Sequence, residues 1–147
     1  MSEINFIACD DELEEMTDNS KNCNFTKKSF RAMIKKKKVN VTQLYYPSIR
    51  LINSVEVEKY GIKKKYIYAV DYRWQTNAVN TLLEYFSRNM KKTEEIEFWS
   101  IWLGNDNKVT HVKQKKVLIN QLNYAFFEQF CEIDSDVKCL KILNNFY

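Results

Sequence analysis

The sequence predicts a single α+β domain over residues 1–147, with a mainly antiparallel sheet and about three helices. Three observations support this fold class. Apolar residues alternate along several short segments, as in strands, and recur at helical spacing along longer ones. The composition, 45% hydrophobic and 14% aromatic, supplies enough apolar surface for a core. A length of 147 residues fits one domain.

The N-terminal part predicts a buried strand followed by an acidic turn. Residues 4–9 form the strand, because their apolar side chains alternate along one face. Residues 10–20 are acidic, and Leu13 and Met16 are compatible with one helical turn there. This part therefore predicts an apolar strand that leads directly into a negatively charged surface.

The next part predicts a helix and then a segment that is either strand or loop. Residues 26–38 carry an apolar stripe at helical spacing, and their lysines crowd the last turn, where the helix dipole favours cations. Residues 39–60 predict one or two strands around Pro47, which belongs at an edge or a bend because it lacks a backbone N–H.

The second half shows a clearer alternation of strands and helices. Residues 65–73 are β-branched and aromatic and predict a strand. One face of this strand consists of Tyr66, Tyr68, Val70 and Tyr72. A helix is then expected up to Lys92, capped by Thr76 or Asn77.

Residues 97–103 are the strongest predicted strand. Both of its faces are apolar, which is typical of a central strand, although one tryptophan could instead be exposed as a contact for another protein. Residues 104–107 predict a turn, and 108–119 the returning strand of a hairpin.

The chain closes with a helix and a strand. Asn120 can cap a helix over 120–132, and residues 138–143 predict the last strand. From residue 65 onward the order is therefore βαββαβ, which is the ferredoxin-like pattern with both helices on one face of the sheet.

Charge is unevenly distributed along the chain. The net charge is +4, but residues 1–20 carry seven acids and no Lys or Arg. Residues 21–73 carry 14 Lys or Arg and three acids, and residues 74–147 carry nine of each. This pattern predicts an acidic lobe and a basic face, which either compensate each other or meet charged partners.

The residues needed for the common reactive centres are scarce, so we expect a non-enzymatic protein without a cofactor or metal. Gly61 and Gly104 are too far apart to form a phosphate-binding loop, and His111, the only histidine, lies among lysines. Paired carboxylates are the remaining enzymatic option, with Asp10 and Asp11 as Mg²⁺ ligands and 94–97 as a supplement. An acidic turn without a ligand explains them equally well.

The sequence also predicts a cytoplasmic protein. It opens without the basic and apolar regions of a signal peptide, and no run of 18 apolar residues could span a membrane. The four cysteines show no paired spacing, which predicts ordinary reduced thiols. They are Cys9, Cys23, Cys131 and Cys139.

Two surfaces could bind a partner. The first combines the acidic segment with the tyrosines of the 65–73 strand, and it is predicted to bind a protein. Its residues are Asp10, Asp11, Glu12, Glu14, Glu15, Asp18, Tyr66, Tyr68 and Tyr72. The alternative is a single-stranded nucleic-acid site that joins the same tyrosines to lysine clusters at 35–38, 63–65 and 113–116. The acids could also form a solvated loop, and the tyrosines could belong to the core.

Three segments resemble small uncharacterised bacterial proteins, some of which are immunity partners of secreted toxins. They are NFIACDDELEE, EEIEFWSIWLGN and KCLKILNNF. The resemblance implies a cytosolic protein that neutralises a toxin domain by blocking its active site, and it assigns no functional residue. Proteins that neutralise nucleases are often acidic overall, whereas this chain carries a net charge of +4.

Overall fold

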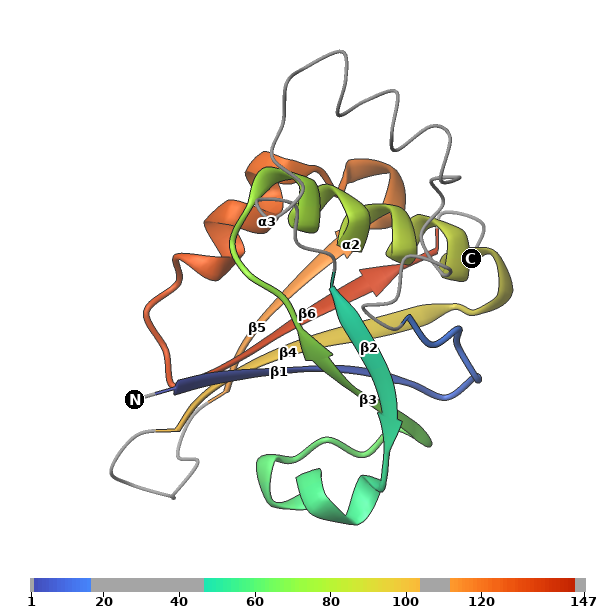
Figure 1. Ribbon diagram of the computed structural model, residues 1–147, viewed down its shortest axis with the longest axis vertical. Helices are drawn as coiled ribbons and strands as arrows, with labels where there is room; N and C mark the ends of the chain where they lie inside the picture. The colour runs from blue at the N-terminus through green and yellow to red at the C-terminus, as the bar shows by residue number, and fades with distance from the viewer. Residues whose placement is uncertain (1, 17–46, 104–111, 145–147) are drawn as a thin grey trace, which may run out of the picture.

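A computed structural model describes residues 2–16, 47–103 and 112–144 of the chain. They form an α+β structure in which a six-stranded sheet carries two α-helices on one face (Figure 1). The strand order is β2-β3-β1-β4-β6-β5, and all neighbours are antiparallel except β5 and β6. The predicted fold class is thus confirmed in its coarse form.

The elements have the following bounds. The strands are β1 (Ser2–Cys9), β2 (Ser48–Ile52), β3 (Tyr66–Asp71), β4 (Glu95–Leu103), β5 (Val112–Leu118) and β6 (Val137–Leu143). The α-helices are α2 (Thr76–Asn89) and α3 (Tyr124–Cys131). Short 3₁₀ helices are η3 (Ser54–Tyr60), η4 (Met90–Lys92) and η5 (Ile119–Gln121).

The order of elements from β3 to β6 is the predicted βαββαβ, but the predicted strand arrangement is wrong. The segments expected to form a hairpin, β4 and β5, do not pair, because β6 lies between them and β5 runs parallel to β6. The first strand, β1, is inserted between β3 and β4. Since α3 connects the parallel neighbours β5 and β6, this part is a βαβ unit rather than half of a ferredoxin-like sheet.

β4 is a central strand, as predicted. It pairs with β1 on one side and with β6 on the other. Phe98 packs under the helices against Phe86 and Phe127, and Trp99 packs on the opposite face. Because both faces are covered, both faces of this strand can be apolar.

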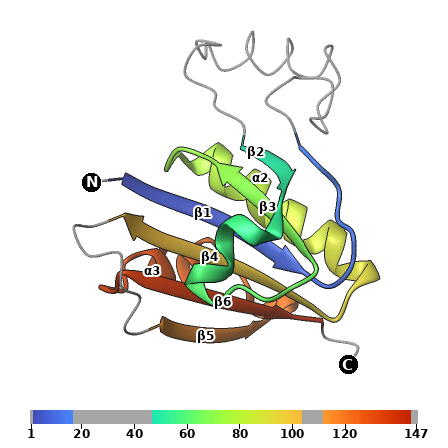
Figure 2. The same ribbon diagram turned by 90° about the horizontal axis from the view of Figure 1, so that it is seen from below.

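The two faces of the sheet have separate cores. The helix side is dominated by aromatic rings, with Phe98 at the centre of the cluster. On the other side, Val57 of η3 and Ile62 cover Ile67 and Trp99 (Figures 1 and 2). This covering segment replaces the strand expected near residues 55–57, because Asn53 caps a 3₁₀ helix by accepting a hydrogen bond from the backbone N–H of Val55.

Two smaller expectations differ from the structure, and a third falls on residues that it does not describe. α2 begins after Gln75, whose side chain makes no cap hydrogen bond, so neither Thr76 nor Asn77 is the cap. No helical turn forms at Leu13 to Met16, because Met16 pairs with β2 instead. The predicted helix 26–38 lies outside the described residues, which contain two α-helices rather than three.

Candidate functional site

The acidic segment after β1 is an ordered, extended part of the structure. We call residues 10–16 the acidic ridge. Its exposed carboxylates are Asp10, Asp11, Glu12, Glu14 and Glu15. The Tyr68 hydroxyl accepts a hydrogen bond from the Leu13 backbone N–H (2.8 Å) and donates one to the Leu13 carbonyl oxygen (3.1 Å). A buried side chain thus holds both backbone groups of one residue within the ridge.

α2 holds the next residue of the ridge in the same way. The Tyr85 hydroxyl donates a hydrogen bond to the Glu14 carbonyl oxygen at 2.7 Å. The Glu14 backbone N–H in turn donates to Asn89 Oδ1 at 3.1 Å. Tyr85 and Asn89 are almost completely buried, at 0% and 1% exposure, so these supports are part of the packed helix–sheet layer.

The ridge ends by closing the edge of β2. Met16 and Ile49 exchange two backbone hydrogen bonds in an antiparallel bridge. The Glu15 carboxylate accepts a third from the Leu51 backbone N–H at 3.3 Å. Pro47 immediately precedes β2, which agrees with the prediction that it lies at an edge.

Several carboxylates of the ridge have polar partners. Lys64 forms ion pairs with Asp10 (3.2 Å) and Glu95 (3.5 Å). Asp11 accepts a hydrogen bond from the Thr93 hydroxyl at 2.7 Å. Burial alone would lower the pKa of Lys64, but the hydrogen bond to Asp10 and the charges of Glu95 and Asp10 outweigh it and raise that pKa.

The arrangement of these acids does not form a metal centre in the part of the chain that the structure describes. No three Asp, Glu, His or Cys side chains converge there with a spacing suitable for an ion. The ammonium group of Lys64 bridges Asp10 and Glu95, one of the carboxylates expected to supplement Asp10 and Asp11. The ridge is therefore better described as a charged surface than as a ligand cage.

The tyrosines of β3 have different environments. Tyr68 is only 1% exposed and supports the ridge from below. Tyr66 is partly buried at the same end of β3, opposite Cys9. Tyr72 is partly buried beyond the other end, against Phe98, and burial raises its pKa. The three rings pack toward the helices, so they form no open stacking platform.

The basic clusters also lie apart. Lys63 to Lys65 precede β3, whereas Lys113, Lys115 and Lys116 lie on β5, and β1, β4 and β6 separate these two strands. Residues 35–38 lie outside the described part of the chain, as do Asp18, Cys23 and His111. The described lysines therefore do not gather into a single basic face with the tyrosines.

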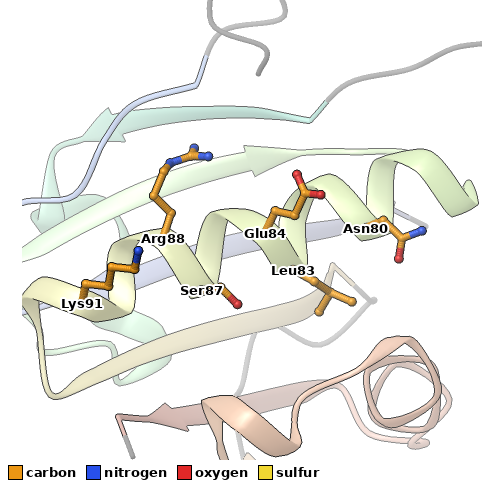
Figure 3. Close-up of a pocket in the computed structure, with 6 residues that line it drawn as sticks. All are labelled: Asn80, Leu83, Glu84, Ser87, Arg88 and Lys91. Carbon is orange, nitrogen blue, oxygen red and sulfur yellow. The ribbon is translucent and has the colours of Figure 1, made fainter. Parts of the chain in front are cut away.

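A pocket that sequence reasoning missed lies beside the ridge, on the outer side of α2. Its described lining consists of Asn80, Leu83, Glu84, Ser87, Arg88 and Lys91, and its volume is about 640 Å³ (Figure 3). Arg88 joins it to the ridge, because its Nε forms an ion pair with Glu14 at 2.9 Å. A smaller cavity of about 250 Å³ shares Ser87 and Lys91 and extends toward η5. No motif signals such a pocket, because its residues form the ordinary polar face of an amphipathic helix.

The remaining candidates from the sequence are a tryptophan and the cysteines. Trp102, at the end of β4, is 41% exposed, so one tryptophan of this strand does reach the surface. Cys9, Cys131 and Cys139 are free thiols whose pKa values are raised mainly by burial. Burial therefore keeps these three cysteines protonated at neutral pH, which opposes nucleophilic or metal-binding roles.

No similarity to a known protein adds to this description. Within the described residues, no helix has both the length and the apolar character needed to cross a membrane. No protein-family model, curated protein or solved structure matches the chain.

Proposed function

We propose that this chain is a non-enzymatic protein-binding module, which presents the acidic ridge to a basic surface of a partner protein. We further propose that the partner is a toxin domain and that the chain acts as its immunity protein. The toxin assignment rests on the resemblance of the three sequence segments described above.

The fixed backbone of the ridge is the observation that carries the proposal. Tyr68, Tyr85 and Asn89 hold Leu13 and Glu14 in one extended conformation. Binding would therefore not have to order a flexible loop, which is a major cost of association. The same four hydrogen bonds satisfy backbone groups of Leu13 and Glu14 and fix the path along which the carboxylates are presented.

Charge supplies the selectivity for a basic partner. Asp10 and Glu14 keep side-chain exposures of 65% and 50% despite their ion pairs. Glu12 is exposed and enters no ion pair among the described residues. Clustered charge of one sign accelerates encounter with a complementary surface and disfavours acidic competitors.

The α2 pocket adds a concave surface next to the ridge. Its lining carries charges of both signs, because Glu84 is acidic and Arg88 and Lys91 are basic. A side chain of the partner could enter it while the partner's cations contact the ridge. A stable complex requires about 1,000 Å² of buried surface in total, which the ridge together with the pocket region could provide.

The proposal is tested by reversing a charge that the fold does not need. Glu12 forms no ion pair with another described residue, so Glu12→Lys should leave stability unchanged. It should slow association with the proposed toxin domain, which would be sought in the neighbouring genes, by about tenfold at low salt. Rates are measured by surface plasmon resonance, and protection by growth of cells that express the toxin domain. Glu132→Lys, an exposed change at the end of α3, is the matched control.

The outcome separates the ridge from other surfaces. We expect the loss of association rate for Glu12→Lys to shrink as salt screens the ridge, with the control unchanged. Full protection and an unaltered association rate for Glu12→Lys would show that the ridge is not the binding surface.

A further inference from the structure

The edge strand β5 is exposed on both of its faces over half of its length. Residues 113–116 are all exposed, whereas Val117 is buried in the helix-side core. Since side chains alternate along a strand, Lys113 and Lys115 share the side of Val117, and Lys116 lies on the other. Figure 2 shows β5 at the edge of the sheet beside β6, and the exposed residues 113–116 lie on both of its faces.

Among the described residues, β5 pairs only with β6. The backbone N–H and C=O groups on its other side have the geometry that accepts a further strand. At the opposite edge of the sheet, a segment of the chain already pairs with β2. The Met16 backbone and the Glu15 carboxylate form hydrogen bonds with backbone groups of that strand. An acidic, extended segment thus closes one edge within this same protein.

The charges on β5 select what can be added there. Lys113, Lys115 and Lys116 take part in none of the ion pairs between described residues. Pairing of two β5 edges from two copies would bring three lysines against three lysines, so self-association by this route is disfavoured. An acidic strand would neutralise them on both faces.

We propose that the free edge of β5 binds an extended, acidic segment of a partner protein by strand addition. Main-chain hydrogen bonds provide the affinity, and Lys113, Lys115 and Lys116 select carboxylates on the two faces of the added strand. Nucleic acid fits this edge less well, because residues 113–116 (KQKK) contain no ring on which a base could stack. The proposal does not depend on the acidic ridge, which lies across the sheet beside β2.

The probe is a blocked peptide of about eight residues, a common strand length, in which pairs of glutamates alternate with pairs of valines. Adjacent residues of a strand lie on opposite faces, so this peptide carries carboxylates on both. Its binding to the full-length protein is measured by fluorescence anisotropy in about 50 mM salt. A second peptide of the same sequence carries N-methyl groups on adjacent residues, which removes backbone donors from both edges of the peptide strand and keeps every charge. We expect the methylated peptide to bind at least about tenfold more weakly.

Two protein variants complete the experiment. The double change Lys115→Glu and Lys116→Glu should weaken peptide binding by at least about tenfold, because it reverses the charge of the edge. The matched control changes Lys59 and Lys92, which are exposed on η3 and η4, to glutamate and should leave binding unchanged. Hydrogen exchange of the same samples reports whether each variant is folded and whether the peptide newly protects amides within residues 112–118.

Three results would overturn the proposal. The first is an absence of peptide binding to the folded wild-type protein. The second is equal binding of the methylated peptide without new amide protection, which would indicate charge attraction alone. The third is tighter binding of a single-stranded oligothymidylate than of the peptide, with the same loss in the lysine variant, which would identify a nucleic-acid surface.

Discussion

The two edges of the sheet differ in how their backbone groups are used. At β2, the acidic ridge folds back along the strand, so Ile49 and Leu51 find partners within the chain. At β5, four successive residues are exposed and three of them are lysines. One edge is closed by a covalently attached acidic segment, and the other carries the complementary charge.

Under the two proposals, each edge of the sheet serves a different kind of binding. An unpaired edge promotes aggregation unless it is covered or charged. In this protein the edge at β2 is covered and the edge at β5 is charged. Covering β2 places five carboxylates on a fixed backbone, which suits recognition of a basic surface. Charging β5 leaves its backbone free for an acidic strand. Breaking the supports of the ridge should therefore affect stability, whereas changing the lysines of β5 should affect binding alone.

The largest expected effect comes from removing the hydroxyl that supports the ridge. Tyr68→Phe leaves the backbone N–H and carbonyl groups of Leu13 without their partner in a buried position. Each buried group left unpaired costs about 1–3 kcal/mol, so for two groups we expect a loss of about 2–6 kcal/mol in the free energy of unfolding. Urea denaturation followed by circular dichroism measures it.

Tyr66→Phe is the matched control, since Tyr66 is partly buried on the same face of β3 and its hydroxyl makes none of the hydrogen bonds found between described residues. It should cost less than about 0.5 kcal/mol. Equal losses for the two variants would mean that the ridge is not held by Tyr68, and the distinction between a closed and an open edge would weaken.

Local structure was more predictable from the sequence than strand order was. β1, β3, β4, β6 and α2 follow from alternation or helical spacing, because these patterns reflect which face each segment buries. The position of β1 between β3 and β4 depends on pairing between residues far apart in the chain, such as Asn5 with Val70 and with Ser100. No local pattern contains that information, so the hairpin of β4 and β5 was the simpler and incorrect choice.

The candidate site was predictable in its charges and not in its supports. The carboxylates of the ridge are visible as a run of acids in the sequence. The sequence leaves Tyr68 either beside these acids on the surface or in the core. Its ring is buried, and its hydroxyl reaches a segment 55 positions earlier in the chain, which no local pattern indicates. The α2 pocket was not predictable, because its described lining is the polar face of one amphipathic helix, which looks the same in the sequence whether or not a pocket forms over it.

Alkaline pH should destabilise the protein through groups that include Cys131, at the end of the helix that joins β5 to β6. Burial raises the pKa of this thiol from 9.0 to about 11, although Tyr72 and Lys138 favour its ionised form. The unfolded chain therefore loses this proton at a lower pH than the folded protein does. The contribution of the protonated Cys131 thiol to stability is complete below pH 9 and is lost as the pH rises to about 11.

Cys131→Ala tests this contribution, because alanine does not titrate. Each pKa unit corresponds to about 1.4 kcal/mol, so the variant should lose about 1–3 kcal/mol less than the wild type between neutral pH and pH 11. Urea midpoints at a series of pH values give the difference, measured in a Tyr72→Phe background because the Tyr72 hydroxyl contacts the Cys131 thiol. The thiols and tyrosines that do not contact Cys131 cancel in this difference. Parallel curves would show that the Cys131 thiol titrates normally in the folded protein.

The smallest effect is expected for the ion pair between Glu14 and Arg88, which links the ridge to the α2 pocket. Their side chains are 50% and 33% exposed, so water and salt screen the 2.9 Å contact. A double-mutant cycle with Glu14→Gln and Arg88→Gln should give a coupling of about 0.2–1 kcal/mol that disappears in about 1 M salt. The backbone of Glu14 keeps its contacts with Tyr85 and Asn89 in all these variants. A coupling well above this range would mean that side-chain charge, and not the backbone hydrogen bonds, holds the ridge closed over its edge of the sheet.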